Sequence, residues 1–132
     1  MDEQLLFGKR ILVVEDEMLV VMAIEDMLVD LGCSSISLAA NVQQALDLIE
    51  QKPFDLATLD LNLDGLQSYS VAQALTERGV PFAFSTGYGK HGVGGGYGGR
   101  PVISKPFSSA QLVATLTALL QPNGLQPALS TR

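Results

Sequence analysis

Cysteine is almost absent from this sequence: Cys33 is the only one among 132 residues, and no hydrophobic run approaches the length of a membrane span. A single cysteine cannot form an internal disulfide and is most often a small buried hydrophobic residue. The acidic N-terminus also lacks the apolar core of a signal peptide. We therefore expect one cytoplasmic domain without membrane contact, stabilised by a hydrophobic core for which 47% hydrophobic residues suffice.

Acidic residues are absent after Glu77. The first 77 residues hold all 14 acids and three basic residues, whereas residues 78–132 hold five basic residues. The net charge of −6 argues against direct, non-specific binding to nucleic acid. The uneven distribution fits an acidic site beside a basic surface, and equally fits solvated faces of unequal sign.

Nucleotide-binding motifs are also missing. No G-x-x-x-x-G-K-[ST] segment is present, which excludes a P-loop. Two G-x-G-x-x-G matches begin at Gly87 and Gly94, but they fall in residues 87–100, where eight of fourteen residues are glycine, and no acid follows to bind a ribose. Because glycine disfavours a helix, we expect a mobile loop there, with His91, the only histidine, exposed to solvent.

The sequence does contain a regular alternation of short β-prone runs and helical segments. Parallel strands need crossover connections, which helices supply, so this alternation predicts a doubly wound α/β fold with helices on both faces of a five-stranded parallel sheet. The domain is expected to cover residues 8–121, with a short or disordered fourth helix, and residues 122–132 to form a flexible tail. The expected strands are residues 10–16, 33–40, 54–61, 80–86 and 101–105, and the expected helices are residues 17–32, 42–52, 68–79 and 108–120.

Polar side chains stand at the ends of four predicted strands. In an open α/β sheet, functional groups gather beyond the carboxyl ends of the strands. Carboxylates held together repel one another and need a cation, and hard oxygen ligands suit Mg²⁺. An aspartate, Mg²⁺, a lysine and a hydroxyl are the parts that phosphoryl transfer requires. The strand-end residues are Glu15 and Asp16, Asp60, Ser85 and Thr86, and Lys105 followed by Pro106.

The segment LDLNLDG, from Leu59 to Gly65, offers a competing metal interpretation. Asp60, Asn62 and Asp64 have the spacing of a calcium-binding EF-hand loop. The twelfth position of such a loop should be a bidentate glutamate, but it is Val71 here. We therefore interpret the EF-hand spacing as accidental, with Asp64 and Gly65 in a turn.

In combination, these motifs resemble the receiver domain of two-component response regulators over nearly all of residues 8–121. The segment VVED carries the acidic pair, LDLNLDG the phosphoacceptor Asp60, FSTG the hydroxyl of Thr86 and SKPF the lysine Lys105. The resemblance implies a flavodoxin-like sheet with strand order 2-1-3-4-5. It also implies that Asp60 accepts a phosphoryl group from a histidine of a sensor kinase or phosphotransfer protein, which changes the binding of a downstream protein.

The resemblance further assigns the metal ligands. Asp16, Asp60 and the backbone carbonyl of Asn62 would bind Mg²⁺, with Glu15 acting through water. The sequence leaves open whether the domain also forms a homodimer.

One position departs from the family pattern. Thr86 and Lys105 would contact the phosphoryl group, and the Lys105–Pro106 peptide bond would be cis, as is usual in the family. Most receivers carry an aromatic switch residue three positions before the lysine, where this chain has Val102. The segment FSTGYG is similar to a receiver subgroup, named for its Phe-Ala-Thr-Gly-x-Tyr motif, that also lacks this aromatic. We therefore hypothesise that phosphorylation orders residues 87–100.

Two other functions compete with this interpretation. A hydrolase of the haloacid-dehalogenase type also uses a strand-end aspartate, Mg²⁺, a hydroxyl and a lysine. It would need a second acid two residues after the nucleophile, where this chain has Asn62, and a cap domain. A pseudo-receiver that only binds partners is disfavoured because every chemical group is present.

Overall fold

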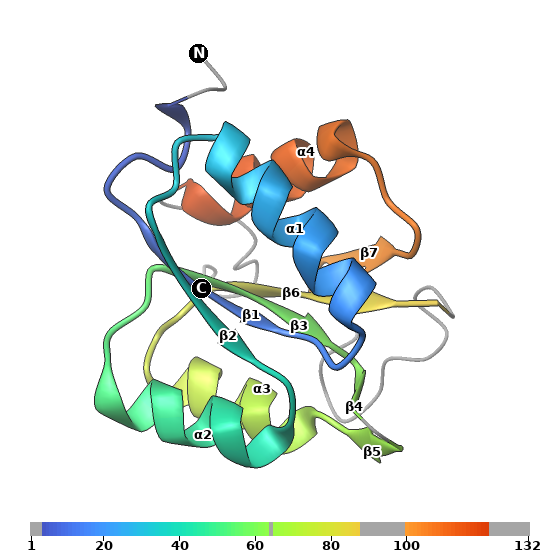
Figure 1. Cartoon of the computed structure of the whole chain (residues 1–132). Helices are drawn as coiled ribbons and strands as arrows, with labels where there is room; N and C mark the ends of the chain where they lie inside the picture. Colours follow the sequence, from blue (N-terminus) through green and yellow to red (C-terminus); the bar gives the residue numbers. More distant parts are fainter. Residues whose placement is uncertain (1–3, 64, 88–99, 122–132) are drawn as a thin grey trace.

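A five-stranded parallel sheet forms the centre of the computed structural model, which describes residues 4–63, 65–87 and 100–121 (Figure 1). The strands lie in the order β2-β1-β3-β6-β7, and all neighbours run parallel. Counted along the chain, this is the predicted order 2-1-3-4-5, so the predicted fold class is confirmed. The strands are β1 (Arg10–Val14), β2 (Ser35–Ala39), β3 (Leu56–Asp60), β6 (Phe82–Thr86) and β7 (Val102–Ser104).

Helices cover both faces of the sheet (Figure 1). One face packs against α1 (Met18–Asp30) and α4 (Ser109–Leu120), and the other against α2 (Val42–Gln51) and α3 (Tyr69–Glu77). Side chains alternate across a strand, so each central strand contributes to two hydrophobic cores. In β1, Ile11 and Val13 belong to the α1 and α4 core, and Leu12 and Val14 belong to the α2 and α3 core.

Two of the three interior strands, β3 and β6, are buried along their whole length. Strands covered on both faces consist mainly of apolar residues, and here polar residues appear at the carboxyl ends. Asp60 is the last residue of β3, and Thr86 is the last residue of β6. The fold therefore fixes these two polar side chains at one edge of a rigid sheet.

The helix ends follow the signals in the sequence. Asn41 accepts a hydrogen bond from the backbone N–H of Gln44 at 2.8 Å at the start of α2. Ser108 and Gln111 form a capping box at the start of α4. Such bonds satisfy amide groups that have no partner in the first turn of a helix. Gly32 follows α1 with a φ of 92°, a conformation that favours glycine.

A short hairpin after β3 was not predicted. β4 (Asn62–Leu63) pairs antiparallel with β5 (Leu66–Gln67), and Gly65, between them, has a φ of 86°. Strands of two residues are too short to show an alternating pattern, which explains why only the turn at residues 64 and 65 was predicted. Leu61 and Leu63, on either side of Asn62, are buried in the core.

Four expectations fall wholly or mostly on residues that the structure does not describe. The fourth helix, the exposure of His91 and the proposed ordering of residues 87–100 all concern a segment in which residues 88–99 are not described. The flexible tail is residues 122–132. Within the described residues, no helix has both the length and the apolar composition needed to cross a membrane.

Candidate functional site

The polar residues at the strand ends meet at the carboxyl edge of the sheet. Glu15 directly follows β1, the neighbour of β3, and Asp60 lies opposite Ser85 in the register of β3 with β6. Thr86 lies opposite Ser104 in the register of β6 with β7, and Lys105 follows Ser104. Four adjacent strands thus deliver these groups to one edge of the molecule.

Three carboxylates converge at this edge. Glu15, Asp16 and Asp60 each offer one oxygen, and these oxygens lie within 4.8 Å of one another. Glu15 and Asp60 are buried, whereas Asp16 is exposed. The backbone N–H of Asn62 donates to Asp60 Oδ1 at 3.2 Å, which places Asn62 beside the carboxylates. These hard oxygen donors match the ligands that Mg²⁺ uses in proteins.

Lys105 is the cation of the cluster. Its ammonium group donates hydrogen bonds to Glu15 Oε2 at 3.2 Å, Glu17 Oε1 at 3.2 Å and Asp60 Oδ2 at 3.3 Å. Its position follows from the strand order, because β7 ends one residue before Lys105 at the edge that also holds Asp60. The first two residues after β1 were predicted site residues, but Glu17, three residues after β1, was not.

The arrangement changes the acidity of its members. Burial raises the pKa of Glu15 to about 7, the nearby Asp60 adds to this effect, and Lys105 opposes it. Burial likewise raises the pKa of Asp60, against the influence of Glu15 and then of Lys105. Burial acts to lower the pKa of Lys105, but its carboxylate partners outweigh burial and raise it to about 12. The lysine is therefore charged at neutral pH, and the two buried carboxyls hold protons more tightly than ordinary acids.

One buried carboxylate oxygen of the cluster is held by an ion pair alone. Glu15 Oε1 lies 3.1 Å from Lys105 Nζ but takes part in no hydrogen bond within the described structure. The Lys105 ammonium compensates this oxygen, but one lysine cannot neutralise all three carboxylates of the cluster when they are ionised. The residues present therefore fit a divalent cation with oxygen ligands.

Ser68 is a second residue that the sequence analysis missed. Its side chain is fully buried and donates to the backbone carbonyls of Asp60 at 2.7 Å and Leu61 at 3.2 Å. It immediately precedes α3, so it ties the end of β3 to the start of that helix. Only the fold brings these positions together, and the sequence shows no signal for the contact beyond a serine at a helix start.

The remaining predicted residues surround this cluster. Thr86 is buried, and its backbone carbonyl accepts a hydrogen bond from the N–H of Lys105 at 2.9 Å. The Lys105–Pro106 peptide bond is cis. Val102 is half-buried and lies opposite Phe84 in the register of β6 with β7. An aliphatic side chain therefore occupies the position of the family's aromatic switch.

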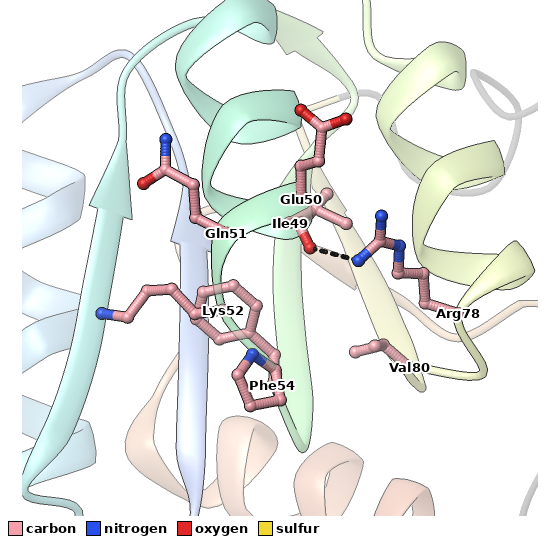
Figure 2. Close-up of a pocket in the computed structure, with 8 residues that line it drawn as sticks. Ile49, Glu50, Gln51, Lys52, Phe54, Arg78 and Val80 are labelled. Carbon is pink, nitrogen blue, oxygen red and sulfur yellow. Dashed lines mark hydrogen bonds between the residues drawn. The ribbon is translucent and has the colours of Figure 1, made fainter.

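A cavity at the opposite end of the sheet, near the start of β3, has a different character. It measures about 350 Å³ and lies between the ends of α2 and α3. Figure 2 shows that Arg78 points at the backbone carbonyl of Ile49, to which it donates at 2.8 Å. Lys52, also at this cavity, donates to Ser37 on β2 at 3.0 Å. Both cations already have acceptors within the protein, so we assign this cavity a structural role.

Comparison with known proteins agrees with this geometry. The family model for the response regulator receiver domain matches residues 11–117. The chain is 32% identical over 127 residues to the probable transcriptional regulator ycf27 of Cyanophora paradoxa, a match that covers 93% of the chain and 52% of that protein. The chain thus spans about half the length of this curated relative.

Solved structures give the same assignment. SdrG from Sphingomonas melonis Fr1 superposes with a TM-score of 0.77 at 39% identity, covering 86% of this chain and 97% of that one. The receiver domain of the sensor histidine kinase PA1611 from Pseudomonas aeruginosa PAO1, which has a magnesium ion coordinated in its active site cleft, gives a TM-score of 0.72 at 29% identity and covers 86% and 98% of the two chains. Because the family model spans most of the sequence, the chain belongs to the family of response regulator receiver domains.

Proposed function

We propose that residues 8–121 act as a phosphoacceptor domain that takes a phosphoryl group on Asp60 in a Mg²⁺-dependent reaction. The observation that carries this proposal is the position of Asp60, a buried carboxylate with the Lys105 ammonium 3.3 Å from Oδ2 and two further acids at its side. A nucleophile beside a fixed cation is the arrangement that phosphoryl transfer needs, because the protein mainly positions groups and stabilises charge in this reaction.

The side chains divide the work between attack and charge stabilisation. An oxygen of Asp60 attacks the phosphorus, a phosphorus–oxygen bond forms, and the phosphorus–nitrogen bond to the donor histidine breaks as the imidazole leaves. Lys105 donates a hydrogen bond to an oxygen of the transferred group. Thr86, at the end of the adjacent strand, supplies a hydroxyl to another oxygen.

The metal site would be formed by the acidic cluster. Asp16, Asp60 and the backbone carbonyl of Asn62 would hold Mg²⁺, with Glu15 acting through water. When bound, the ion neutralises negative charge on the phosphoryl oxygens. The carboxylate oxygens within 4.8 Å of one another and the magnesium-bound receiver of PA1611 both support this assignment.

The expected donor is a histidine on a sensor kinase or phosphotransfer protein, and the expected output is altered binding to a downstream protein in the cytoplasm. Membership of the response regulator receiver family and the similarity to the probable transcriptional regulator ycf27 support a signalling role rather than turnover of a substrate. The acidic net charge of −6 argues against direct binding to nucleic acid by this domain.

Intact mass spectrometry tests the proposal. The wild type, Asp60→Asn and the control Asp47→Asn, an acid on α2, are incubated with acetyl phosphate with and without Mg²⁺. We expect one phosphoryl adduct on the wild type and on Asp47→Asn, only with Mg²⁺, and none on Asp60→Asn. An adduct that persists in Asp60→Asn would refute the assignment of the acceptor. A wild type without any adduct, while Mg²⁺ binding is shown separately, would point to a domain that only binds partners.

A further inference from the structure

The ammonium group of Lys105 has used all of its hydrogen-bond donors. A lysine has three N–H donors, and here each goes to a different carboxylate, on Glu15, Glu17 and Asp60. Within these contacts, Glu15 and Asp60 belong to the cluster of possible metal ligands, but Glu17 does not. Glu17 is thus a fourth acid at this edge, and it contacts the site through the lysine.

Glu17 differs from the other two partners in its exposure. Its side chain is 62% exposed, whereas those of Glu15 and Asp60 are 1% and 7% exposed. Its carboxylate can therefore leave the lysine and be hydrated at little cost, since exposed ion pairs contribute only about 0 to 1 kcal/mol. Glu15 has no such alternative, because a buried carboxylate that loses its partner is left without compensation.

The position of Glu17 at the start of α1 adds a second observation. Glu17 is the N-cap residue of α1, but its side chain makes no capping hydrogen bond. A negative charge at this position is favoured by the helix dipole. Here the Glu17 carboxylate accepts a hydrogen bond from Lys105 and none from the backbone of the first turn of α1.

Transfer of a phosphoryl group changes what Lys105 must do. The N–H that now points to Asp60 has to move to a phosphoryl oxygen, and the other two carboxylates hold the ammonium in its present place. Of those two, Glu17 is the partner that can be released. Its negative charge also repels the incoming phosphoryl dianion.

We propose that Glu17 is a positioning residue that competes with the phosphoryl group for Lys105 and so slows phosphorylation of Asp60. This inference rests on the proposed function. Glu17, the residue directly after the acidic pair, would thus set how fast Asp60 accepts a phosphoryl group.

The test compares Glu17→Gln with Asp26→Asn. Glutamine keeps the size of the side chain and removes its charge, and Asp26→Asn removes an exposed charge from the same helix, away from the lysine. Phosphorylation by acetyl phosphate is followed by intact mass at saturating Mg²⁺, so that a small change in metal affinity has no effect. We expect Glu17→Gln to react roughly two- to fivefold faster than the wild type, the size of one exposed ion pair, and Asp26→Asn to match the wild type.

Two further measurements separate this role from a structural one. The affinity for beryllium fluoride, a phosphoryl mimic that needs no bond to break, should rise by a similar factor in Glu17→Gln. The ratio of phosphorylation rates and the ratio of beryllium fluoride affinities, each of Glu17→Gln to the wild type, should fall toward one at about 1 M salt, where the charge of Glu17 is largely screened. Unfolding midpoints of the two variants should agree.

The experiment separates failure of the inference about Glu17 from failure of the proposed function. If the wild type accepts a phosphoryl group on Asp60 but Glu17→Gln reacts at the same rate as Asp26→Asn or more slowly, the competition is disproved and the proposed function stands. If the wild type and Asp60→Asn behave alike, the proposed function itself is wrong.

Discussion

Lys105 Nζ lies 3.1 Å from Glu15 Oε1, which joins the end of β7 to the end of β1 across two intervening strands. The glutamate side chain is 1% exposed, and the lysine side chain is 16% exposed. A buried carboxylate is tolerated only with a partner, so this pair is a condition for keeping Glu15 charged at the edge of the sheet.

Replacing Lys105 by methionine should therefore destabilise the domain in a pH-dependent way. Without the ammonium, Glu15 and Asp60 repel each other when ionised, and we expect a loss of about 1 to 3 kcal/mol in the free energy of unfolding at pH 8. The loss should shrink at pH 5, where Glu15 is protonated. Urea denaturation without metal measures both values. The control is Lys52→Met, which removes a lysine from the opposite end of the sheet. Equal losses in unfolding free energy at pH 8 and pH 5 would mean that the aliphatic part of the lysine side chain, and not its charge, stabilises the domain.

The stability of the metal-free domain should fall as pH rises from 4.5 to above 7. The pKa of Glu15 is raised by burial to about 7, so in this range the folded protein holds a proton that the unfolded chain has released. This contribution is complete below the ordinary pKa and lost as pH passes the folded value. It amounts to at most about 3 kcal/mol, at 1.36 kcal/mol per pKa unit.

Glu15→Gln provides the test of this pH dependence. Glutamine cannot titrate, so the slope of unfolding free energy against pH should flatten, apart from the part due to Asp60, whose pKa is also raised by burial. Asp47→Asn, an acid on α2, should keep the wild-type slope. A variant Glu15→Gln with an unchanged slope would place the titrating group elsewhere.

Magnesium and protons should compete for the acidic cluster. Because burial raises the pKa of Glu15 to about 7, we expect Mg²⁺ to bind roughly tenfold more tightly at pH 8 than at pH 6. Calorimetric titration at the two pH values measures this ratio. Asp16→Asn should bind Mg²⁺ more weakly at both, because it removes the exposed member of the cluster. An affinity that does not change with pH would show that Glu15 is not coupled to the metal.

The fold could be predicted because its signals are local. Each of the five strands of the parallel sheet and each of the four described helices lies within a segment that is β-prone or has helical periodicity. Caps such as Asn41 and stops such as Gly32 mark helix ends. The hairpin of β4 and β5 escaped prediction because it is stabilised by its place after β3 rather than by a pattern of its own.

The site could be predicted only in part, for a similar reason. Strand ends in a parallel sheet meet at one edge, so Glu15, Asp60 and Lys105 were expected to lie together. In the structure, the carboxylates of Glu15 and Asp60 both lie within hydrogen-bond distance of the Lys105 ammonium. Glu17 contacts Lys105 across 88 residues of sequence, and this contact depends on how α1 leaves β1. Such a contact follows from three-dimensional packing, which strand periodicity does not encode.

Ser68 provides the last test, because it supports Asp60 without belonging to the reacting groups. Its hydroxyl donates to the Asp60 carbonyl at 2.7 Å in a fully buried position, so Ser68→Ala leaves that carbonyl without this bond. We expect a loss of about 1 to 2 kcal/mol in the free energy of unfolding by urea. Ser70→Ala, at an exposed position on α3, should change it by less than about 0.5 kcal/mol. Equal effects of the two substitutions would show that the end of β3 is held by the sheet alone. A larger loss for Ser68→Ala would identify the serine as the link that fixes the backbone of Asp60 to α3.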